Sequence, residues 1–267
     1  MTIVFDSRAD LGFRDIARSF SQAGLVWTLA MREIRSRYRR STLGPFWITA
    51  SMIATVLGMS FVFSALMNRP FAEYVPYLAT GMAIWALFTG VVSEGSGALI
   101  RAAPLIRNST APISSHLFRH QLEQLIFFAH NILPAIAIVI FVGSASVTGA
   151  ILSLCGLAVA FVAVGWMGFF AAIISTRFRD VPQIVLNVMQ VFFFITPVIW
   201  HADDLGRNRF VIDFNPFYYL VSVVRDPLIG AFPAVHVWIV AVVIALGGWL
   251  VTALLFQRLY GRLTKWL

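Results

Sequence analysis

The stretch from Gln124 to Thr176 contains no Asp, Glu, Lys or Arg, and it limits the possible folds more than any other part of the sequence. A membrane-spanning helix needs about 20 apolar residues, so this stretch is too long for one span. The run of small residues from Gly143 to Gly149 is typical of a short turn. The stretch therefore predicts two spans, at residues 120–142 and 150–176, of an all-α integral membrane protein.

Four further apolar segments have the length of a span. They lie at residues 43–67, 75–95, 181–200 and 235–257. The composition agrees, because 59% of the 267 residues are hydrophobic and only 12% are charged, against roughly 25% charged residues in soluble domains. We expect one transmembrane domain over residues 1–267 with six spans. The first residues lack the apolar core of a signal peptide, so we expect no cleavable signal.

The distribution of basic residues predicts the orientation. With a cytoplasmic N-terminus, about 16 of the Lys and Arg residues lie in inner segments, as the positive-inside rule requires. Six spans then return the C-terminus to the cytoplasmic side. The net charge of +8 is better explained by contact with anionic membrane lipids than by nucleic acid.

The segment from Phe13 to Arg40 has the periodicity of an amphipathic helix. Such a helix, with one apolar stripe and an Arg-rich remainder, is typical of the plane of the membrane interface. The alternative is an amphipathic helix packed on a soluble domain. The predicted stripe consists of Ile16, Phe20, Gly24, Trp27, Met31, Ile34 and Tyr38. The arginines near its end are Arg32, Arg35, Arg37, Arg39 and Arg40.

Two connecting segments differ from ordinary loops. Residues 95–115 combine apolar and basic side chains between prolines. This pattern is suited to docking on a partner. The alternative is a surface helix without a partner. The residues concerned are Leu99, Arg101, Leu105 and Arg107. Residues 203–234 contain an apolar run too short to span. We expect short helices that dip into the outer leaflet as a gate, against a membrane-lying loop without a gating role. The candidate gate residues are Asn215, Pro216, Tyr218, Tyr219 and Arg225.

Several kinds of chemistry have no counterpart in the sequence. The only lysine is Lys265, so the chain carries no P-loop, and no HExxH, CxxC or GxSxG motif occurs. The single cysteine, Cys155, cannot form an intrachain disulfide. No charged residue lies in the middle of a predicted span, where ion-coupled transporters usually carry one. We therefore expect no catalytic residues, no metal site and no cofactor in this chain.

The stretch from Leu29 to Trp47 reads LAMREIRSRYRRSTLGPFW and contains an N-terminal motif. This motif resembles that of a known family, the permease subunits of ABC-type polysaccharide exporters, which carry O-antigen, capsule or teichoic-acid chains. Glu33 replaces the usual Asp of the motif. Three later motifs are similar and occur in the same order: Phe178-Arg179-Asp180-Val181, Thr196-Pro197-Val198 and Asn215-Pro216. The matching residues of the N-terminal motif are Leu29, Arg32, Arg37, Tyr38, Ser41, Leu43, Gly44 and Trp47.

The resemblance implies a homodimer in the bacterial inner membrane that works with two copies of a cytoplasmic ATP-binding subunit. ATP and Mg²⁺ would be bound by that partner. Residues 13–40 would form the interface helix, residues 95–115 would include the coupling helix seated on the ATPase, and residues 203–234 would supply the outer gate. A channel for a lipid-linked glycan would run between the two copies.

Aromatic side chains suit such a channel, because sugar rings stack on aromatic faces. The alternative for each residue is a lipid-facing or core position. The candidates are Phe46, Phe61, Phe88, Phe192 and Phe193. Two other functions are compatible with the sequence: an ABC exporter of the same fold for a drug or lipid, and a membrane enzyme or scaffold without transport.

Overall fold

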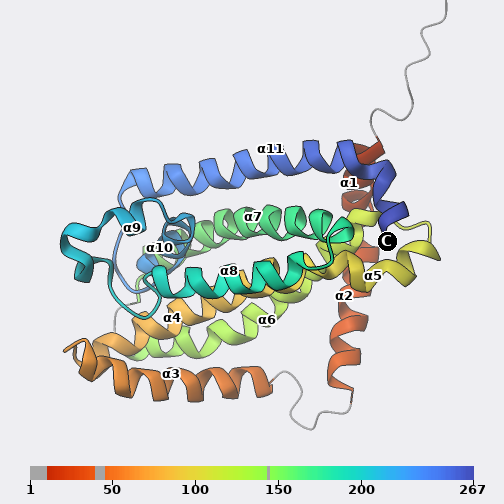
Figure 1. Ribbon diagram of the computed structural model, residues 1–267. Helices are drawn as coiled ribbons and strands as arrows, with labels where there is room; N and C mark the ends of the chain where they lie inside the picture. Colours follow the sequence, from red (N-terminus) through yellow and green to blue (C-terminus); the bar gives the residue numbers. More distant parts are fainter. Residues whose placement is uncertain (1–10, 40–45, 143–144) are drawn as a thin grey trace, which may run out of the picture.

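The computed structural model describes residues 11–39, 46–142 and 145–267. The motif residues Ser41, Leu43 and Gly44 lie outside these ranges, as does Arg40. Long helices run side by side and form a bundle (Figure 1). They are α3 (Phe46–Leu66), α4 (Phe71–Thr89), α6 (Ile113–Val142), α7 (Val147–Arg177), α8 (Val181–Ile195) and α11 (Val235–Trp266).

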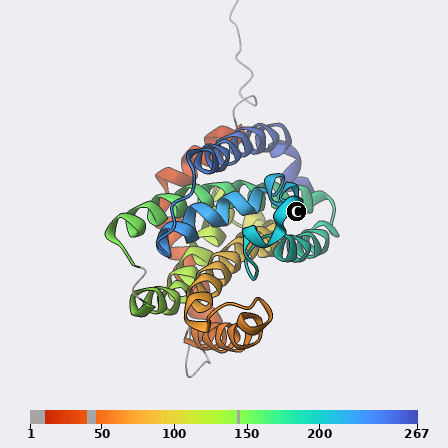
Figure 2. The same ribbon diagram turned by 90° about the vertical axis from the view of Figure 1, so that its left-hand side faces the viewer.

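Shorter elements lie at the two ends of this bundle (Figures 1 and 2). At one end, called the α2 end, are α1 (Leu11–Ser21), α2 (Ala23–Tyr38) and α5 (Ala98–Arg107). At the other, called the α9 end, are the 3₁₀-helix η2 (Ala202–Asn208) and α9 (Phe210–Asp213), followed by α10 (Pro216–Leu228). The π-helical segment η1 (Gly90–Glu94) continues α4.

Five helical segments in the described residues are long and apolar enough to cross a membrane. They are Phe46–Leu66, Phe71–Glu94, Ile113–Val142, Val147–Arg177 and Val235–Trp266. The expected spans at 75–95, 120–142, 150–176 and 235–257 were too short at one or both ends. The reason is that each of these helices continues beyond the uncharged segment from which its span was predicted. The expected turn at 143–149 is shorter too: Ser146 caps α7 by accepting a hydrogen bond from the Gly149 amide (3.0 Å).

The expected fifth span, residues 181–200, is wrong at its end. The helix α8 stops at Ile195, and Thr196 has extended backbone angles (φ −93°, ψ 136°). The reason is Pro197, because a residue that precedes proline avoids the helical region. At about 1.5 Å per residue, α8 alone is shorter than the roughly 30 Å hydrocarbon core.

The expected single helix at 13–40 is divided in two. Gln22 (φ −103°, ψ 33°) separates α1 from α2. The helix α1 packs on α11 so closely that a Cβ at Gly12 would lie 2.7 Å from the Cα atom of Gln257, whereas α2 lies along α6.

The helix α10 is packed between longer helices at the α9 end of the bundle rather than lying over it as an exposed lid. Its residues Leu220, Val221 and Val223 are fully buried in the main hydrophobic cluster, together with residues of α4, α7 and α11. Helix α10 is therefore covered by protein, and its entry into the outer leaflet stays a prediction. The helix is too short to span a membrane, and none of its residues from Pro216 to Leu228 is exposed. Such protein cover is the condition for a short helix at membrane depth.

Candidate functional site

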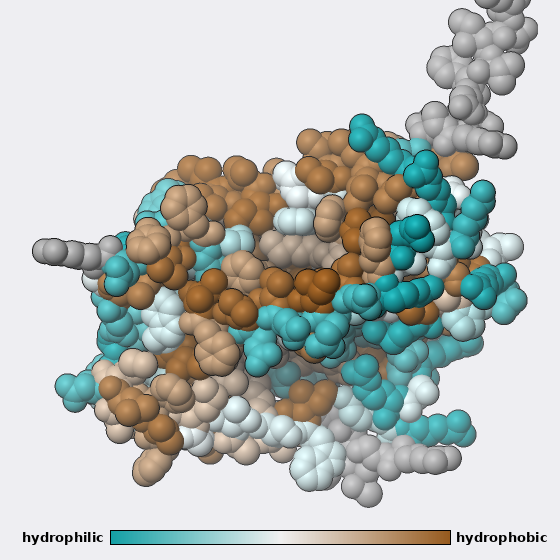
Figure 3. Space-filling model, in the orientation of Figure 1, coloured by the Kyte–Doolittle hydropathy of each residue, from teal (hydrophilic) through white to brown (hydrophobic). Residues whose placement is uncertain are grey.

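One face of the bundle carries polar side chains on an otherwise apolar helix. Gln183, Asn187 and Gln190 of α8 are all exposed, and their spacing of four and three residues places them on one side of the helix. Gln183 Nε2 donates to Asn187 Oδ1 at 3.3 Å. Figure 3 shows a hydrophilic band along α8, between this helix and α3. We call Gln183, Asn187 and Gln190 the amide stripe.

The amide stripe needs polar surroundings. An amide side chain that faces hydrocarbon without hydrogen-bond partners costs several kcal/mol, roughly 2–7 by transfer scales. The three side chains lie on the outside of this chain, so the missing partners must come from water, a ligand or another protein. A face of this composition is suited to an aqueous path or to a protein interface.

A cavity of about 350 Å³ lies beside the amide stripe, between α4 and α8. Gln190 forms part of its wall, and Thr89 of α4 supplies a hydroxyl group opposite. The remaining lining residues are apolar and include Trp85 and Phe193, whose ring centroids are 5.7 Å apart. The cavity thus combines aromatic faces with hydrogen-bonding groups.

The structure brings together three of the five predicted channel aromatics and separates the other two. Phe193 lines the cavity, while Phe88 and Phe192 lie beneath it and contact Phe217 with centroid distances of 6.1 and 4.9 Å. Phe46 and Phe61 lie on the exposed side of α3. A role of these residues in a channel stays a prediction.

At the α2 end, the predicted interface residues lie mostly on the surface. Trp27, Arg32, Arg35 and Arg37 are exposed, and Tyr38 is half-buried. Burial raises the pKa of the Tyr38 hydroxyl above its usual value. Glu33, which stands where the resemblance has Asp, pairs with Arg119 of α6 (Nη1 to Oε2, 3.1 Å). The acidic position of the motif therefore ties α2 to α6.

A buried carboxylate fastens α1 to the same end of the bundle, and the sequence analysis missed it. Asp15 accepts hydrogen bonds from the backbone amides of Ile113 (2.8 Å) and Ser114 (2.9 Å) and from the hydroxyls of Ser114 and Tyr260. The first amides of a helix have no intrahelical partner, so Asp15 caps α6 from another helix. Asp15 lies outside the predicted apolar stripe, and no motif marks it in the sequence.

Replacement of Asp15 with alanine is expected to destabilise the protein by about 1–3 kcal/mol, because buried donors lose their acceptor. Asp15→Asn retains one side-chain acceptor and should lose less. Thermal unfolding of the purified protein in detergent measures both. Asp213→Ala, at an exposed position, is the control, and an Asp15→Ala protein as stable as this control would contradict the capping role.

The predicted coupling residues fall into two groups. Leu105 and Arg101 of α5 are exposed, whereas Leu99 is fully buried in a cluster with Phe169 and Phe256. Arg107 donates to the backbone carbonyl of Leu267. Leu99 is therefore a core residue in this conformation, and the surface that α5 offers to a partner is formed around Leu105. Nearby, Asp180 occupies the N-cap position of α8, and its side chain makes no capping hydrogen bond.

At the α9 end, two of the motifs in the resemblance contact each other. Asn215 caps α10 by accepting a hydrogen bond from the Phe217 amide (3.0 Å), and its Nδ2 donates to Thr196 Oγ1 at 2.9 Å. Arg225, which is 3% exposed, donates to the Pro197 carbonyl at 2.5 Å. Tyr218 and Tyr219 are half-buried. The predicted gate residues Asn215 and Arg225 thus hold the segment at which α8 ends.

An imidazole packs against this segment. The His201 ring stacks on Tyr77 with a centroid distance of 3.7 Å. Burial, followed by the positive charges of Arg69 and Arg225, lowers the pKa of His201 to about 4. The neighbouring groups that titrate or carry charge are Arg69, Tyr74, Tyr77, Asp203, Asp204 and Arg225.

We expect the stability of the protein to fall as the pH drops from about 6.5, the usual value for histidine, to about 4. In this window the unfolded chain binds a proton at His201 and the folded protein does not, so acid favours unfolding. The pH dependence of the thermal midpoint measures the effect. His201→Phe keeps a stacked ring and should reduce the slope of the profile between pH 4 and 6.5, and an unchanged slope would show that other groups cause it.

Comparison with known proteins places these features in a family context. The family model described as "ABC-2 type transporter" matches residues 24–229. The chain is 23% identical over 209 residues to the O-antigen export system permease protein RfbA of Klebsiella pneumoniae, covering 76% of this chain and 79% of the relative. It is 21% identical to the protein of the same name in Myxococcus xanthus (78% and 82% covered). It is 20% identical to the polysialic acid transport protein KpsM of Escherichia coli (75% and 80% covered).

Proposed function

This chain belongs to the membrane family of ABC-2 type transporters, and we propose that it is the channel-forming permease of an ATP-driven exporter that moves a lipid-linked polysaccharide across the bacterial cytoplasmic membrane. The relatives named for O-antigen export and polysialic acid transport support polysaccharide as the substrate class. In this arrangement the α2 end, with its arginines, faces the cytoplasm, and the α9 end faces outward.

The amide stripe is the observation that carries the proposal. A two-fold axis places the same surface of two copies face to face, so two amide stripes enclose a path lined by hydrogen-bonding groups. Sugar hydroxyls donate to and accept from amides, and Trp85 and Phe193 beside the stripe offer aromatic faces to sugar rings. A single copy would leave the stripe against lipid, which is why we propose a homodimer.

The energy for transport comes from a second protein in this proposal. The sequence contains no phosphate-binding loop, so ATP and Mg²⁺ are bound by two copies of a separate subunit. The exposed part of α5 around Leu105 is the proposed docking surface. Leu105→Glu should therefore abolish copurification of the ATP-binding subunit, whereas Phe214→Glu, at an exposed apolar position of the α9 end outside the candidate spans, should not affect it.

Cysteine accessibility tests the path directly. Single cysteines are placed at Gln183, Asn187 and Gln190, and at the exposed apolar neighbours Ile184, Val188 and Val191, in a Cys155→Ser background. A charged, water-soluble methanethiosulfonate reagent is expected to label the first three positions in membranes and to spare the other three. Equal labelling of both sets, or the reverse pattern, would refute a water-lined path along α8.

A deletion strain tests the substrate. Cells that lack this chain should lose surface polysaccharide and accumulate it inside on its lipid carrier, and the wild-type gene should restore export. Normal surface polysaccharide together with drug sensitivity would favour a small-molecule exporter instead. Normal polysaccharide without any transport defect would favour an enzyme or scaffold.

A further inference from the structure

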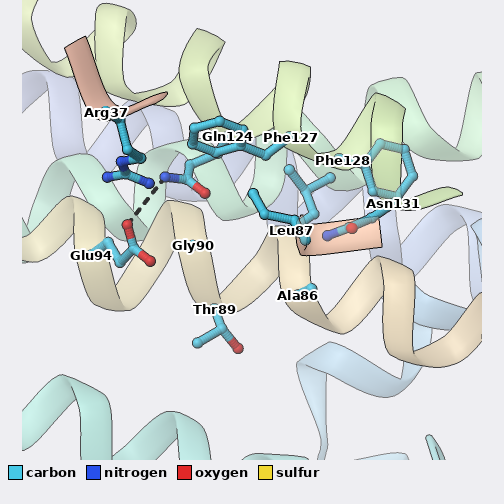
Figure 4. Close-up of a pocket in the computed structure, with 11 residues that line it drawn as sticks. Arg37, Ala86, Leu87, Thr89, Gly90, Glu94, Gln124, Phe127, Phe128 and Asn131 are labelled. Atoms are coloured by element: carbon cyan, nitrogen blue, oxygen red, sulfur yellow. Dashed lines mark hydrogen bonds between the residues drawn. The ribbon is translucent and has the colours of Figure 1, made fainter. Parts of the chain in front are cut away.

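A second cavity, of about 370 Å³, lies on α4 between α2, α3 and α6 (Figure 4). It contains charged, amide and aromatic side chains. A groove of this mixed composition at membrane depth is unusual, because lipid tails require only apolar walls. Its polar lining residues are Arg37, Thr89, Glu94, Gln124 and Asn131, and its large apolar ones are Ile48, Leu87, Phe127 and Phe128.

The charged end of the cavity is built around Gln124. Its Nε2 donates to Glu94 Oε2 at 3.3 Å, and the Arg37 guanidinium lies 5.1 Å from the centre of the Phe127 ring (Figure 4). Gly90 makes room for this amide, since a Cβ there would lie 2.2 Å from Gln124 Oε1. One cation and one anion share this end, so the cavity does not select a ligand for negative charge.

The deep end of the cavity has an unused hydrogen-bonding group. Asn131 is 8% exposed, and its Oδ1 is buried without a hydrogen-bond partner. Figure 4 shows this amide directed along the groove toward Leu87. Asn131 lies two helical turns from Gln124, about 10 Å along the axis. A buried polar atom without a partner is costly, so a ligand that fills the groove must carry a hydrogen-bond donor at Asn131 as well as polar groups at the charged end.

We infer that this cavity binds an uncharged sugar unit of the exported glycan, an inference that rests on the proposed function. Sugar hydroxyls accept from Arg37 and the amide nitrogens and donate to Glu94 and Asn131 Oδ1, while Phe127 offers an apolar face to the C–H surface of the ring. A phospholipid with its headgroup at Arg37 would place an acyl chain against Asn131. A diphosphate would be repelled by Glu94. Neither a phospholipid nor a diphosphate provides suitable partners at both ends of the cavity.

Photo-crosslinking in cells tests the ligand without knowledge of its structure. Ile48 in the cavity, or exposed Ile140 on α6 as the matched control, is replaced by p-benzoylphenylalanine in a strain that makes the glycan. Irradiation should give a high-mass, periodate-sensitive ladder for the Ile48 variant and none for the Ile140 variant. A phospholipid adduct alone at Ile48, or no ladder in cells that export glycan, would overturn the inference. A strain in which this chain exports no glycan would instead overturn the proposed function.

Asn131→Leu separates binding from folding. Leucine fills a similar space without a polar atom, so the folded protein should be at least as stable. If Asn131 binds the sugar, the ladder and the export rate at limiting glycan should both fall about tenfold. Ala129→Leu, at an exposed position of the same helix, should change neither. Unchanged export and an unchanged ladder in the Asn131→Leu protein would show that this amide does not contact the glycan.

Discussion

Replacement of Gly156 with alanine is expected to destabilise the protein by about 2–3 kcal/mol, which is a large overpacking effect. A Cβ at Gly156 would lie 2.0 Å from the carbonyl oxygen and 2.5 Å from the carbonyl carbon of Val223 in α10. Both atoms are backbone atoms of a helix, so no side chain can move aside. The helices α7 and α10 would have to separate, and the Ser153 hydroxyl would lose its hydrogen bond to the Val224 carbonyl (2.7 Å).

Gly247→Ala provides the matched control. A Cβ at Gly247 of α11 has no atom within 4 Å, and alanine within a helix is favoured over glycine by up to about 1 kcal/mol. The two substitutions add the same methyl group and should shift the free energy of unfolding in opposite directions. Titration with SDS in mixed micelles, or thermal unfolding in one detergent, measures both. A similar shift for both proteins would mean that α10 does not lie against α7.

The glycine contact also shows where sequence-based reasoning about the fold succeeds and where it stops. The uncharged stretch at 124–176 was enough to predict two spans, because length and hydropathy are local properties. The burial of α10 was not predictable in this way. The apolar run at 217–224 is compatible with a lipid leaflet and with a protein core. Its position in the core depends on Gly149 and Gly156, whose lack of a side chain lets the α10 backbone approach α7 closely. This contact forms only in the folded chain.

The candidate site shows the same division. The amide stripe could have been recognised from the spacing of Gln183, Asn187 and Gln190, but charged residues were taken as the sign of a polar path, and the fifth span has none in its middle. The capping of α6 by Asp15 joins residues 98 positions apart, so no local pattern reveals it. Pro197 marks the end of α8, because a proline restricts the backbone of the residue before it, here Thr196. An analysis of hydropathy does not register this effect.

Replacement of Arg225 with methionine is expected to destabilise the protein by about 3 kcal/mol, near the lower end of the range for breaking a buried ion pair. Arg225 Nε lies 3.0 Å from Asp226 Oδ1, and its guanidinium carbon lies 4.0 Å from the centre of the Tyr77 ring. Its removal leaves the Asp226 carboxylate without a cation. The loss is limited because the Pro197 carbonyl retains the Tyr77 hydroxyl as a donor (2.9 Å). Arg69→Met, which breaks the exposed pair with Asp204, should cost less than about 1 kcal/mol.

The double variant Arg225→Met, Asp226→Asn identifies the source of this loss. If the unpaired carboxylate causes most of it, removal of that charge should restore much of the stability, and the two changes should be strongly non-additive. Equal stability of the single and double variants would assign the loss to the hydrogen bond with Pro197 and to the Tyr77 ring instead. Because Pro197 follows the end of α8, a freed 196–200 segment should also change the labelling of Gln190→Cys by the water-soluble thiol reagent. Changed labelling of Gln190→Cys would show that the buried Arg225 holds the amide stripe in position as well as stabilising the fold.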